Sequence, residues 1–123
     1  MILVDSSVWI DHFRHDDPTL STLLNKRQVL THPFVIGEMA LGGLRQRDVI
    51  LDALCGLSSA QVATDKEVQA FIDHHKLFGI GIGYVEAHLL AGTLLSVGAK
   101  LWTRDKRLRN AAFRLGLDAA QDQ

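Results

Sequence analysis

The sequence has one cysteine, two prolines and no long uncharged apolar run. The shortage of cysteine and the lack of a long apolar run each exclude a class of protein. Cys55 cannot form an internal disulfide, which fits a reducing compartment, and without neighbouring Cys or His ligands it is predicted to be a small buried hydrophobe. The longest nearly apolar stretch, 79–98, carries Glu86 and His88 in its middle, so no membrane-spanning helix is expected. Residues 1–5 lack the basic start of a signal peptide, and we expect a cytoplasmic protein.

Neither sign of charge dominates, because thirteen Lys and Arg face fourteen Asp and Glu, for a formal net charge of −1. A general attraction to nucleic acid or to acidic membranes is therefore not expected. Six of the cations nevertheless fall between residues 100 and 114, where Asp105 is the single acid, so any affinity for a polyanion is predicted to be local. No repeat or Pro/Ser-rich linker divides the 123 residues, and one domain over 1–123 is expected.

Hydrophobic spacing predicts short strands that alternate with helices. A capping box from Thr64 to Glu67 marks the start of one helix, and the helix expected over 84–97 is apolar on nearly every face, as in a packed interior. Gly79–Gly83 is predicted to be a turn between two helices, because it lacks the full dinucleotide-binding spacing. The alternation implies a parallel sheet covered on both faces, an α/β sandwich. The predicted strands are 2–5, 28–31, 61–64 and 99–103.

Three carboxylates stand in apolar sequence and are expected inside the domain. Asp5 follows Ile-Leu-Val, Glu38 lies within Val-Ile-Gly-Glu-Met-Ala-Leu, and Glu86 lies within Tyr-Val-Glu-Ala-His-Leu-Leu. Burial of an ionised carboxylate costs several kcal/mol unless the group is paired or coordinates a metal. Asp105 follows a predicted strand, as Asp5 does, and parallel sheets bind ligands beyond the carboxyl ends of their strands. These two acids are therefore expected to share a crevice.

Carboxylates that converge without a Cys/His ligand set make an oxygen-only site, which favours Mg²⁺ or Mn²⁺ over zinc. Such an ion activates water and neutralises a phosphodiester, so the predicted chemistry is metal-assisted hydrolysis of an anionic substrate. The alternative is that the acids form separate salt bridges or cap helices, Asp105 most readily as the N-cap of the helix after it. Spacing alone leaves both interpretations open.

Three segments carry a resemblance to a known family. They are Val4-Asp5-Ser6-Ser7-Val8-Trp9-Ile10, then Ile36-Gly37-Glu38, and Lys100-Leu101-Trp102-Thr103-Arg104-Asp105-Lys106-Arg107-Leu108. In this order, and over almost the whole chain, they resemble the PIN-domain family, specifically the VapC-type toxins of bacterial toxin–antitoxin pairs. The Trp-Thr-x-Asp-x-x-Leu pattern is the more specific motif.

The resemblance implies a PIN-like fold, a three-layer α/β/α sandwich with a five-stranded parallel sheet. It also implies a Mg²⁺- or Mn²⁺-dependent endoribonuclease that hydrolyses phosphodiester bonds in RNA. The expected partners are RNA, a cognate VapB-type antitoxin that blocks the site, and a second copy of the chain in a homodimer. By the same resemblance, the catalytic, metal-binding acids are Asp5, Glu38, Glu86 and Asp105.

The chain departs from the family at Glu86, where the family usually has aspartate. Glutamate keeps the charge but adds a methylene to a site that depends on sub-ångström placement, which predicts retained metal binding with reduced turnover. The alternative function is therefore a catalytically weakened PIN-like domain that binds RNA or a partner without cutting. An acid-pocket phosphatase ranks last, because Asp5 is followed by Ser6 and Ser7 without the second aspartate of an Asp-x-Asp pattern.

Several polar residues near these acids have two interpretations. Ser6 and Thr103 either hold the acids and a metal-bound water or cap the ends of strands. The four cations that follow the last predicted strand either contact RNA phosphates or form a solvated helix face. These four are Arg104, Lys106, Arg107 and Arg109.

Among the remaining aromatic and apolar residues, burial is the main expectation. His88 lies about 200° around the helix from Glu86 and is predicted to be a packed core histidine, with the other five histidines on the surface. Trp9 and Trp102 are predicted to pack in the core instead of stacking on bases. Four apolar residues near the N-terminal helices either face the antitoxin or pack within the monomer. They are Ile10, Phe13, Leu20 and Leu24.

Overall fold

The short aliphatic runs form a parallel β-sheet. In the computed structural model, which describes residues 1–122, the strand order is β3-β2-β1-β4. In register, Ile2 lies opposite Val29 on one side and Lys100 on the other, so β1 is a central strand. The strands are β1 (Ile2–Val4), β2 (Val29–Thr31), β3 (Ser58–Ser59) and β4 (Lys100–Trp102).

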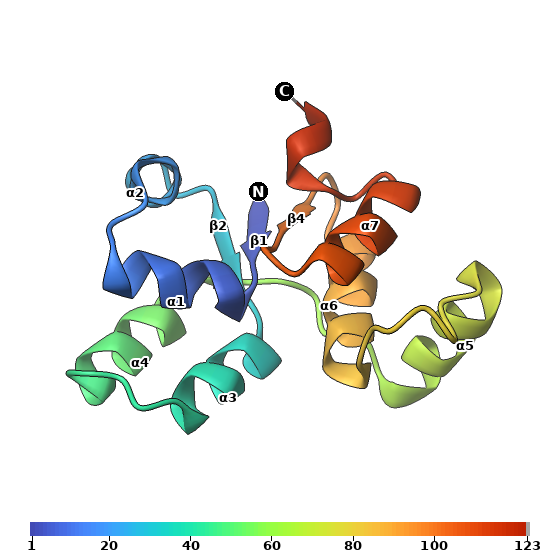
Figure 1. The fold of residues 1–123 in the computed structure, drawn as a ribbon, viewed down its shortest axis with the longest axis horizontal. Coiled ribbons are helices and arrows are strands. Elements are labelled where there is room, and N and C mark those ends of the chain that lie inside the picture. Colours follow the sequence, from blue (N-terminus) through green and yellow to red (C-terminus); the bar gives the residue numbers. More distant parts are fainter. Residues whose placement is uncertain (123) are drawn as a thin grey trace.

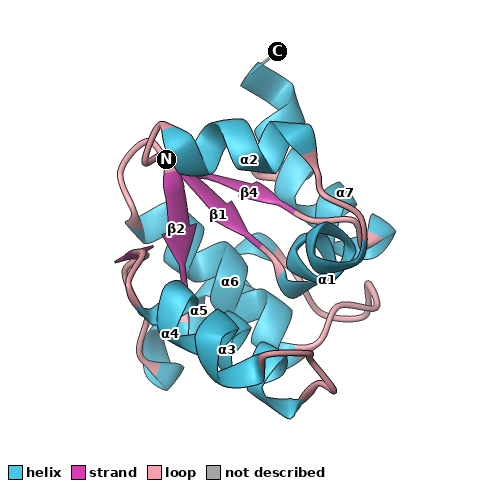
Figure 2. Ribbon diagram, turned by 90° about the vertical axis from the view of Figure 1, so that its left-hand side faces the viewer, coloured by secondary structure: helices cyan, strands magenta, loops and turns pink. Residues whose placement is uncertain are grey.

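Helices cover both faces of this sheet, as the alternation of strands and helices predicts (Figure 1). The chain crosses the sheet from β1 to β3 and then returns to β4 on the far side of β1. Right-handed crossovers therefore place the first four helices on one face and the last three on the other, and Figures 1 and 2 show this arrangement. The helices are α1 (Ser6–Arg14), α2 (Pro18–Asn25), α3 (Pro33–Leu41), α4 (Arg47–Cys55), α5 (Asp65–His75), α6 (Tyr84–Leu95), α7 (Lys106–Arg114) and a final 3₁₀ turn, Ala119–Asp122.

The expectation of five strands is wrong, since the sheet within residues 1–122 has four. After α7 the chain does return alongside β4, where the backbone N–H of Leu101 donates to the carbonyl of Leu117 at 2.7 Å. Only one isolated parallel bridge follows, between Leu101 and Asp118. The 3₁₀ turn that begins at Ala119 ends the extended segment there, so it is too short to form a strand.

The third strand lies earlier than predicted. Ser58 and Ser59 pair with β2, whereas 61–64 has no strand structure. The backbone N–H of Gln61 donates instead to the Ser96 hydroxyl at 2.9 Å. The chain therefore turns away from the sheet at this residue. The β-branched character of 61–64 therefore reflects a connecting segment that packs against the end of α6.

The core lies on both sides of β1 and β4 and includes the whole middle of α6. Seven successive residues, Ala87 to Thr93, are buried, which confirms that this helix packs inside the domain. Trp9 and His88 are also core residues as predicted, with exposures of 3% and 2%. Among residues 1–122 we find no helix with both the length and the apolar character that a membrane crossing requires.

Two burial predictions are wrong. Cys55 is exposed at the C-terminal end of α4. His32, expected on the surface, is completely buried. It is the N-cap of α3, where its Nδ1 accepts a hydrogen bond from the backbone N–H of Phe34 at 3.0 Å. A capping role therefore explains why this polar side chain is inside.

Candidate metal centre

Asp5 and Asp105 follow the two strands at which the direction of strand succession reverses. β1 is followed in the sheet by β2 on one side and by β4 on the other, and ligands of open parallel sheets bind at the carboxyl ends of strands at such a point. Asp5 comes directly after β1, and its backbone N–H donates to the carbonyl of Trp102 at 2.9 Å. This bond joins the end of β1 to the end of β4, where Thr103 and Asp105 follow.

Asp5 is buried, with 6% exposure, and hydroxyl groups surround its carboxylate. Its Oδ2 accepts hydrogen bonds from Ser7 Oγ at 2.7 Å and from Thr103 Oγ1 at 2.8 Å. Its Oδ1 lies 3.5 Å from Ser6 Oγ. These contacts fix the orientation of the carboxylate without a cationic side chain from the described residues.

Ser7 is a functional candidate that the sequence analysis missed. Of the two predicted supporting residues, Thr103 contacts Asp5 directly, whereas Ser6 donates to Glu38 Oε1 at 3.3 Å. The spacing of Asp5 and Ser7 could have predicted this contact. At the start of a helix, a hydroxyl two residues after an aspartate can reach back to the aspartate side chain. Ser7 also accepts from the backbone N–H of Arg104 at 3.0 Å, so it ties α1 to the end of β4.

Glu38, on α3, is electrostatically coupled to two other predicted ligands. Partial desolvation of its carboxyl raises the pKa of Glu38 above its usual value, and the negative charges of Asp5 and Glu86 raise it further. The hydrogen bond from Ser6 acts in the opposite direction. Glu38 is therefore close enough to both Asp5 and Glu86 to be repelled by each of them.

The other two acids make backbone contacts at helix starts. Glu86, in the first turn of α6, accepts from the backbone N–H of Gly83 at 2.9 Å. Asp105 is the N-cap of α7, and its Oδ1 accepts from the backbone N–H of Leu108 at 3.0 Å. In the structure the Asp105 side chain therefore caps α7, as the capping interpretation predicts.

The expectation that Asp5, Glu38 and Glu86 are all inside is wrong for the glutamates. Only Asp5 is buried, while Glu86 is half-buried and Glu38 is exposed. The reason is that each glutamate lies on a side of its otherwise apolar helix that solvent reaches. Across residues 1–122, no three Asp, Glu, His or Cys side chains stand close enough to hold one metal ion, since each acid has its own hydrogen-bond donor.

The residues nevertheless fit a hard divalent cation by chemistry. The donors are carboxylate oxygens, and hydroxyl groups line the side of Asp5 that faces the protein. In the described part of the chain, none of the four acids forms an ion pair with Lys or Arg. The repulsion at Glu38 is therefore opposed by the hydrogen bond from Ser6 but by no cationic side chain that the structure describes.

Of the four predicted RNA-contacting cations, Arg104 is engaged within the protein. Its Nε lies 2.6 Å from Asp11 Oδ2 and its Nη2 lies 2.7 Å from Asp17 Oδ2. Its guanidinium also lies over the Trp102 ring, 5.8 Å from the centroid. Arg104 thus connects α1, α2 and β4. Lys106, Arg107 and Arg109 are exposed and form no ion pair within residues 1–122.

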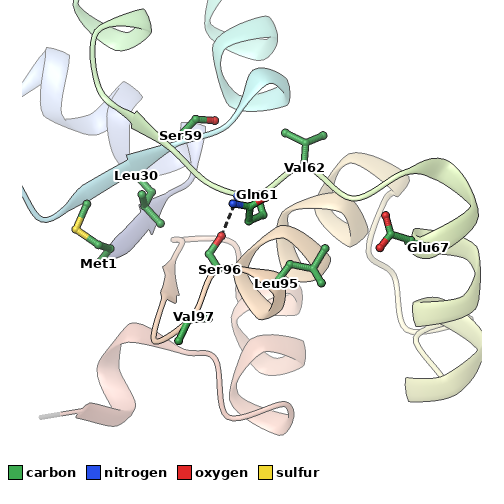
Figure 3. A pocket seen from close by; sticks show the side chains of 9 residues that line it. All are labelled: Met1, Leu30, Ser59, Gln61, Val62, Glu67, Leu95, Ser96 and Val97. Atoms are coloured by element: carbon green, nitrogen blue, oxygen red, sulfur yellow. Dashed lines mark hydrogen bonds between the residues drawn. The ribbon is translucent and has the colours of Figure 1, made fainter.

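A separate open pocket of about 510 Å³ lies at the opposite end of β1 (Figure 3). Met1 lines it and precedes β1, whereas Asp5 follows the strand, so the pocket and the acids do not share a surface. Gln61 and Ser96 also line it, and a hydrogen bond from the backbone N–H of Gln61 to Ser96 Oγ joins them. Its other lining residues are Leu30, Ser59, Val62, Glu67, Leu95 and Val97.

Comparison with known proteins places the chain in a family. No family model matches it. A curated protein named Ribonuclease VapC32, from Mycobacterium tuberculosis (strain CDC 1551 / Oshkosh), is 47% identical over 122 residues, which cover 99% of this chain and 98% of that relative. The protein of the same name from strain ATCC 25618 / H37Rv is similar to the same extent. With this identity over nearly its full length, the chain belongs to the VapC ribonuclease family.

Proposed function

We propose that this protein is an endoribonuclease toxin that uses Mg²⁺ or Mn²⁺ to hydrolyse phosphodiester bonds in RNA. The observation that carries the proposal is the Glu38 carboxyl, whose pKa is raised by partial desolvation and by the charges of Asp5 and Glu86, in a chain of the VapC family. These acids lack a cationic side-chain partner in the described residues, which is what a site completed by a divalent cation requires.

Each side chain has a distinct task in this proposal. Asp5, Glu38, Glu86 and Asp105 hold the cation, which when bound neutralises phosphate charge and lowers the pKa of water. Ser7 and Thr103 fix the orientation of the Asp5 carboxylate through their two short hydrogen bonds. Ser6 orients the Glu38 carboxylate. The site is thereby organised before substrate arrives, which lowers the cost of reaching the transition state.

The test is metal-dependent cleavage by the purified protein. We expect RNA cleavage in Mg²⁺ or Mn²⁺, none in EDTA, and a loss of at least about 100-fold in kcat for Asp5→Asn. The control is Asp73→Asn, an exposed acid on α5, which should cleave like the unmodified protein. Equal cleavage by Asp5→Asn and Asp73→Asn would contradict the proposal and point to a contaminating nuclease.

A catalytically weakened module that binds RNA or a partner is the second candidate, and the contact of Glu86 with Gly83 favours it. That hydrogen bond occupies a carboxylate oxygen in the first turn of α6. RNA binding without any metal-dependent cleavage would support this candidate over the nuclease. The same purified protein serves for both measurements.

We further propose that the antitoxin binds a groove beside α1. Ile10 and Phe13, one helical turn apart on α1, are 38% and 40% exposed and line a cavity of about 920 Å³ together with Ile50 of α4. Leu20, in contrast, is fully buried, so it belongs to the monomer core. We expect Ile10→Glu to abolish co-purification with the antitoxin while RNA cleavage is retained, since Ile10 is not among the acids of the site.

A homodimer completes the proposal. Leu94 and Leu95 of α6 are 49% and 43% exposed and line a largely apolar groove of about 430 Å³ with Phe71. Such a surface is typical of contacts between subunits. Sedimentation velocity should give twice the monomer mass, and Leu94→Lys should shift the species to the monomer. An unmodified protein that sediments as a monomer would contradict this part.

A further inference from the structure

Arg107 lies flat against a glycine of the loop between α5 and α6. A Cβ placed on Gly81 would lie 2.7 Å from Arg107 Nη1 and 2.8 Å from its Cδ, closer than real side chains approach. Gly81 also has a positive φ of 86°, which glycine adopts at little cost. Glycine at this position therefore allows both the turn and the close seating of the arginine.

The two segments that meet at this contact each carry one of the four acids. The loop that carries Gly81 also carries Gly83, whose backbone N–H donates to the Glu86 carboxylate. Arg107 itself is two residues after Asp105, in the first turn of α7. The contact between Gly81 and Arg107 therefore joins the start of α7 to the loop before α6.

Nothing within the described chain accounts for the charge of Arg107. It forms no ion pair within residues 1–122. A cation in the first turn of a helix is also electrostatically unfavourable, and the first turn of α7 contains no acid. An exposed guanidinium that packs against Gly81 without an ionic partner in the described residues is suited to an anion from outside the protein.

We propose that Arg107 binds an RNA phosphate next to the scissile one and that Gly81 is the residue that positions it. This inference rests on the proposed nuclease function. Guanidinium groups pair with phosphates through two parallel hydrogen bonds, and a seated side chain loses less entropy on binding. Because the contact is to the backbone, it increases affinity for all RNA sequences alike.

The test uses two glycines of the same loop. Gly79 also has a positive φ, 72°, but a Cβ there meets no atom within 4 Å. Gly79→Ala and Gly81→Ala therefore impose similar backbone strain, and only Gly81→Ala displaces Arg107. We expect Gly81→Ala to raise KM for RNA about tenfold with little change in kcat, and Gly79→Ala to leave KM unchanged. Thermal melting of both variants controls for folding.

A binding measurement keeps the test independent of cleavage. A fluorescein-labelled, unstructured oligoribonucleotide of mixed sequence is titrated in the Asp5→Asn background at several salt concentrations. We expect Arg107→Gln to reduce the slope of log Kd against log salt concentration by about 0.7, the contribution of one phosphate on a single strand. Adding Gly81→Ala to Arg107→Gln should weaken binding no further.

Three outcomes would overturn the inference: equal KM values for the two alanine variants, an unchanged salt slope for Arg107→Gln, or additive losses in the double variant. Failure of the proposed function shows separately, as absence of metal-dependent cleavage by the unmodified protein. The binding arm then still decides whether Arg107 contacts RNA through the seat at Gly81.

Discussion

The burial of His32 makes the stability of this protein depend on pH. Desolvation and the nearby charge of His88 lower the pKa of the His32 imidazole from 6.5 to about 4. A histidine that is harder to protonate in the folded state than in the unfolded state stabilises the fold above the unfolded pKa. The free energy of unfolding therefore falls as the pH drops from about 6.5 to about 4, by roughly 3 kcal/mol if His32 acts alone.

The variant that tests this is His32→Asn, because asparagine keeps a side-chain acceptor at the N-cap of α3 but does not titrate. Urea denaturation at pH 7.5 and at pH 4.5 gives the loss of stability for both proteins. We expect the loss to be smaller in His32→Asn by about 3 kcal/mol. An identical loss in the two proteins would show that other groups cause the acid sensitivity.

A substitution of Glu86 tests whether the site is adapted to glutamate or whether glutamate lowers its turnover. In the structure its carboxylate reaches back to Gly83, a contact that suits the longer side chain. We expect Glu86→Asp to lower kcat for RNA cleavage about tenfold, because the shorter acid must give up this contact to reach a shared cation. A sharp rise in kcat would instead support attenuation by the extra methylene.

At this scale, sequence reasoning predicted burial correctly for only one of the three acids in apolar sequence. The apolar context of Asp5 correctly indicates burial, because the residue ends a central strand. The same argument fails for Glu38, because a helix with mainly apolar residues can still turn one side to an open crevice. His32, expected on the surface, is buried as the N-cap of α3, where it accepts from the backbone N–H of Phe34.

At the scale of elements, the start of α7 combines two roles in one side chain. Asp105 caps the helix and is also a proposed ligand. Asp105→Asn retains a capping acceptor but lacks the negative charge, whereas Asp105→Ala loses both. We expect both variants to lose cleavage, and only Asp105→Ala to lose about 1 kcal/mol of stability in urea denaturation. Full cleavage by Asp105→Asn would remove Asp105 from the proposed ligand set.

Element prediction worked where local signals were strong and failed where tertiary pairing decides. The capping box at Thr64 and Glu67 starts α5 as predicted, with both hydrogen bonds present. The third strand was misplaced because two serines carry no hydrophobic pattern, and their pairing with β2 is set by the long-range approach of the chain. The expected fifth strand came from a family resemblance, and it is reduced here to one bridge at Asp118.

At the scale of the whole molecule, crowding of acids at one end of the sheet should link stability to divalent cations. A cation that binds only the folded state stabilises it by about 2.7 kcal/mol at 100 times its Kd. We expect the melting temperature to rise by several degrees in millimolar Mn²⁺ and to return in EDTA. Asp5→Asn should show a much smaller rise, and an equal rise would place the bound cation elsewhere.

The overall arrangement was predictable to the level of a parallel sheet between two layers of helices, because alternation of strand and helix allows few other solutions. The order of the strands follows from no local pattern, and it is this order that makes β1 and β4 neighbours, so that Asp5 and Asp105 follow adjacent strands. That the two acids share a crevice stays a prediction from the general behaviour of parallel sheets.

The shortness of β3 has a consequence for self-association of the chain. Unpaired backbone groups on a long outer strand act as a template on which further chains assemble into aggregates. Here one rim of the sheet offers two serines, and the chain at Leu117 and Asp118 shields the opposite rim. Strand-by-strand polymerisation therefore has little to start from, and the protein should stay dispersed.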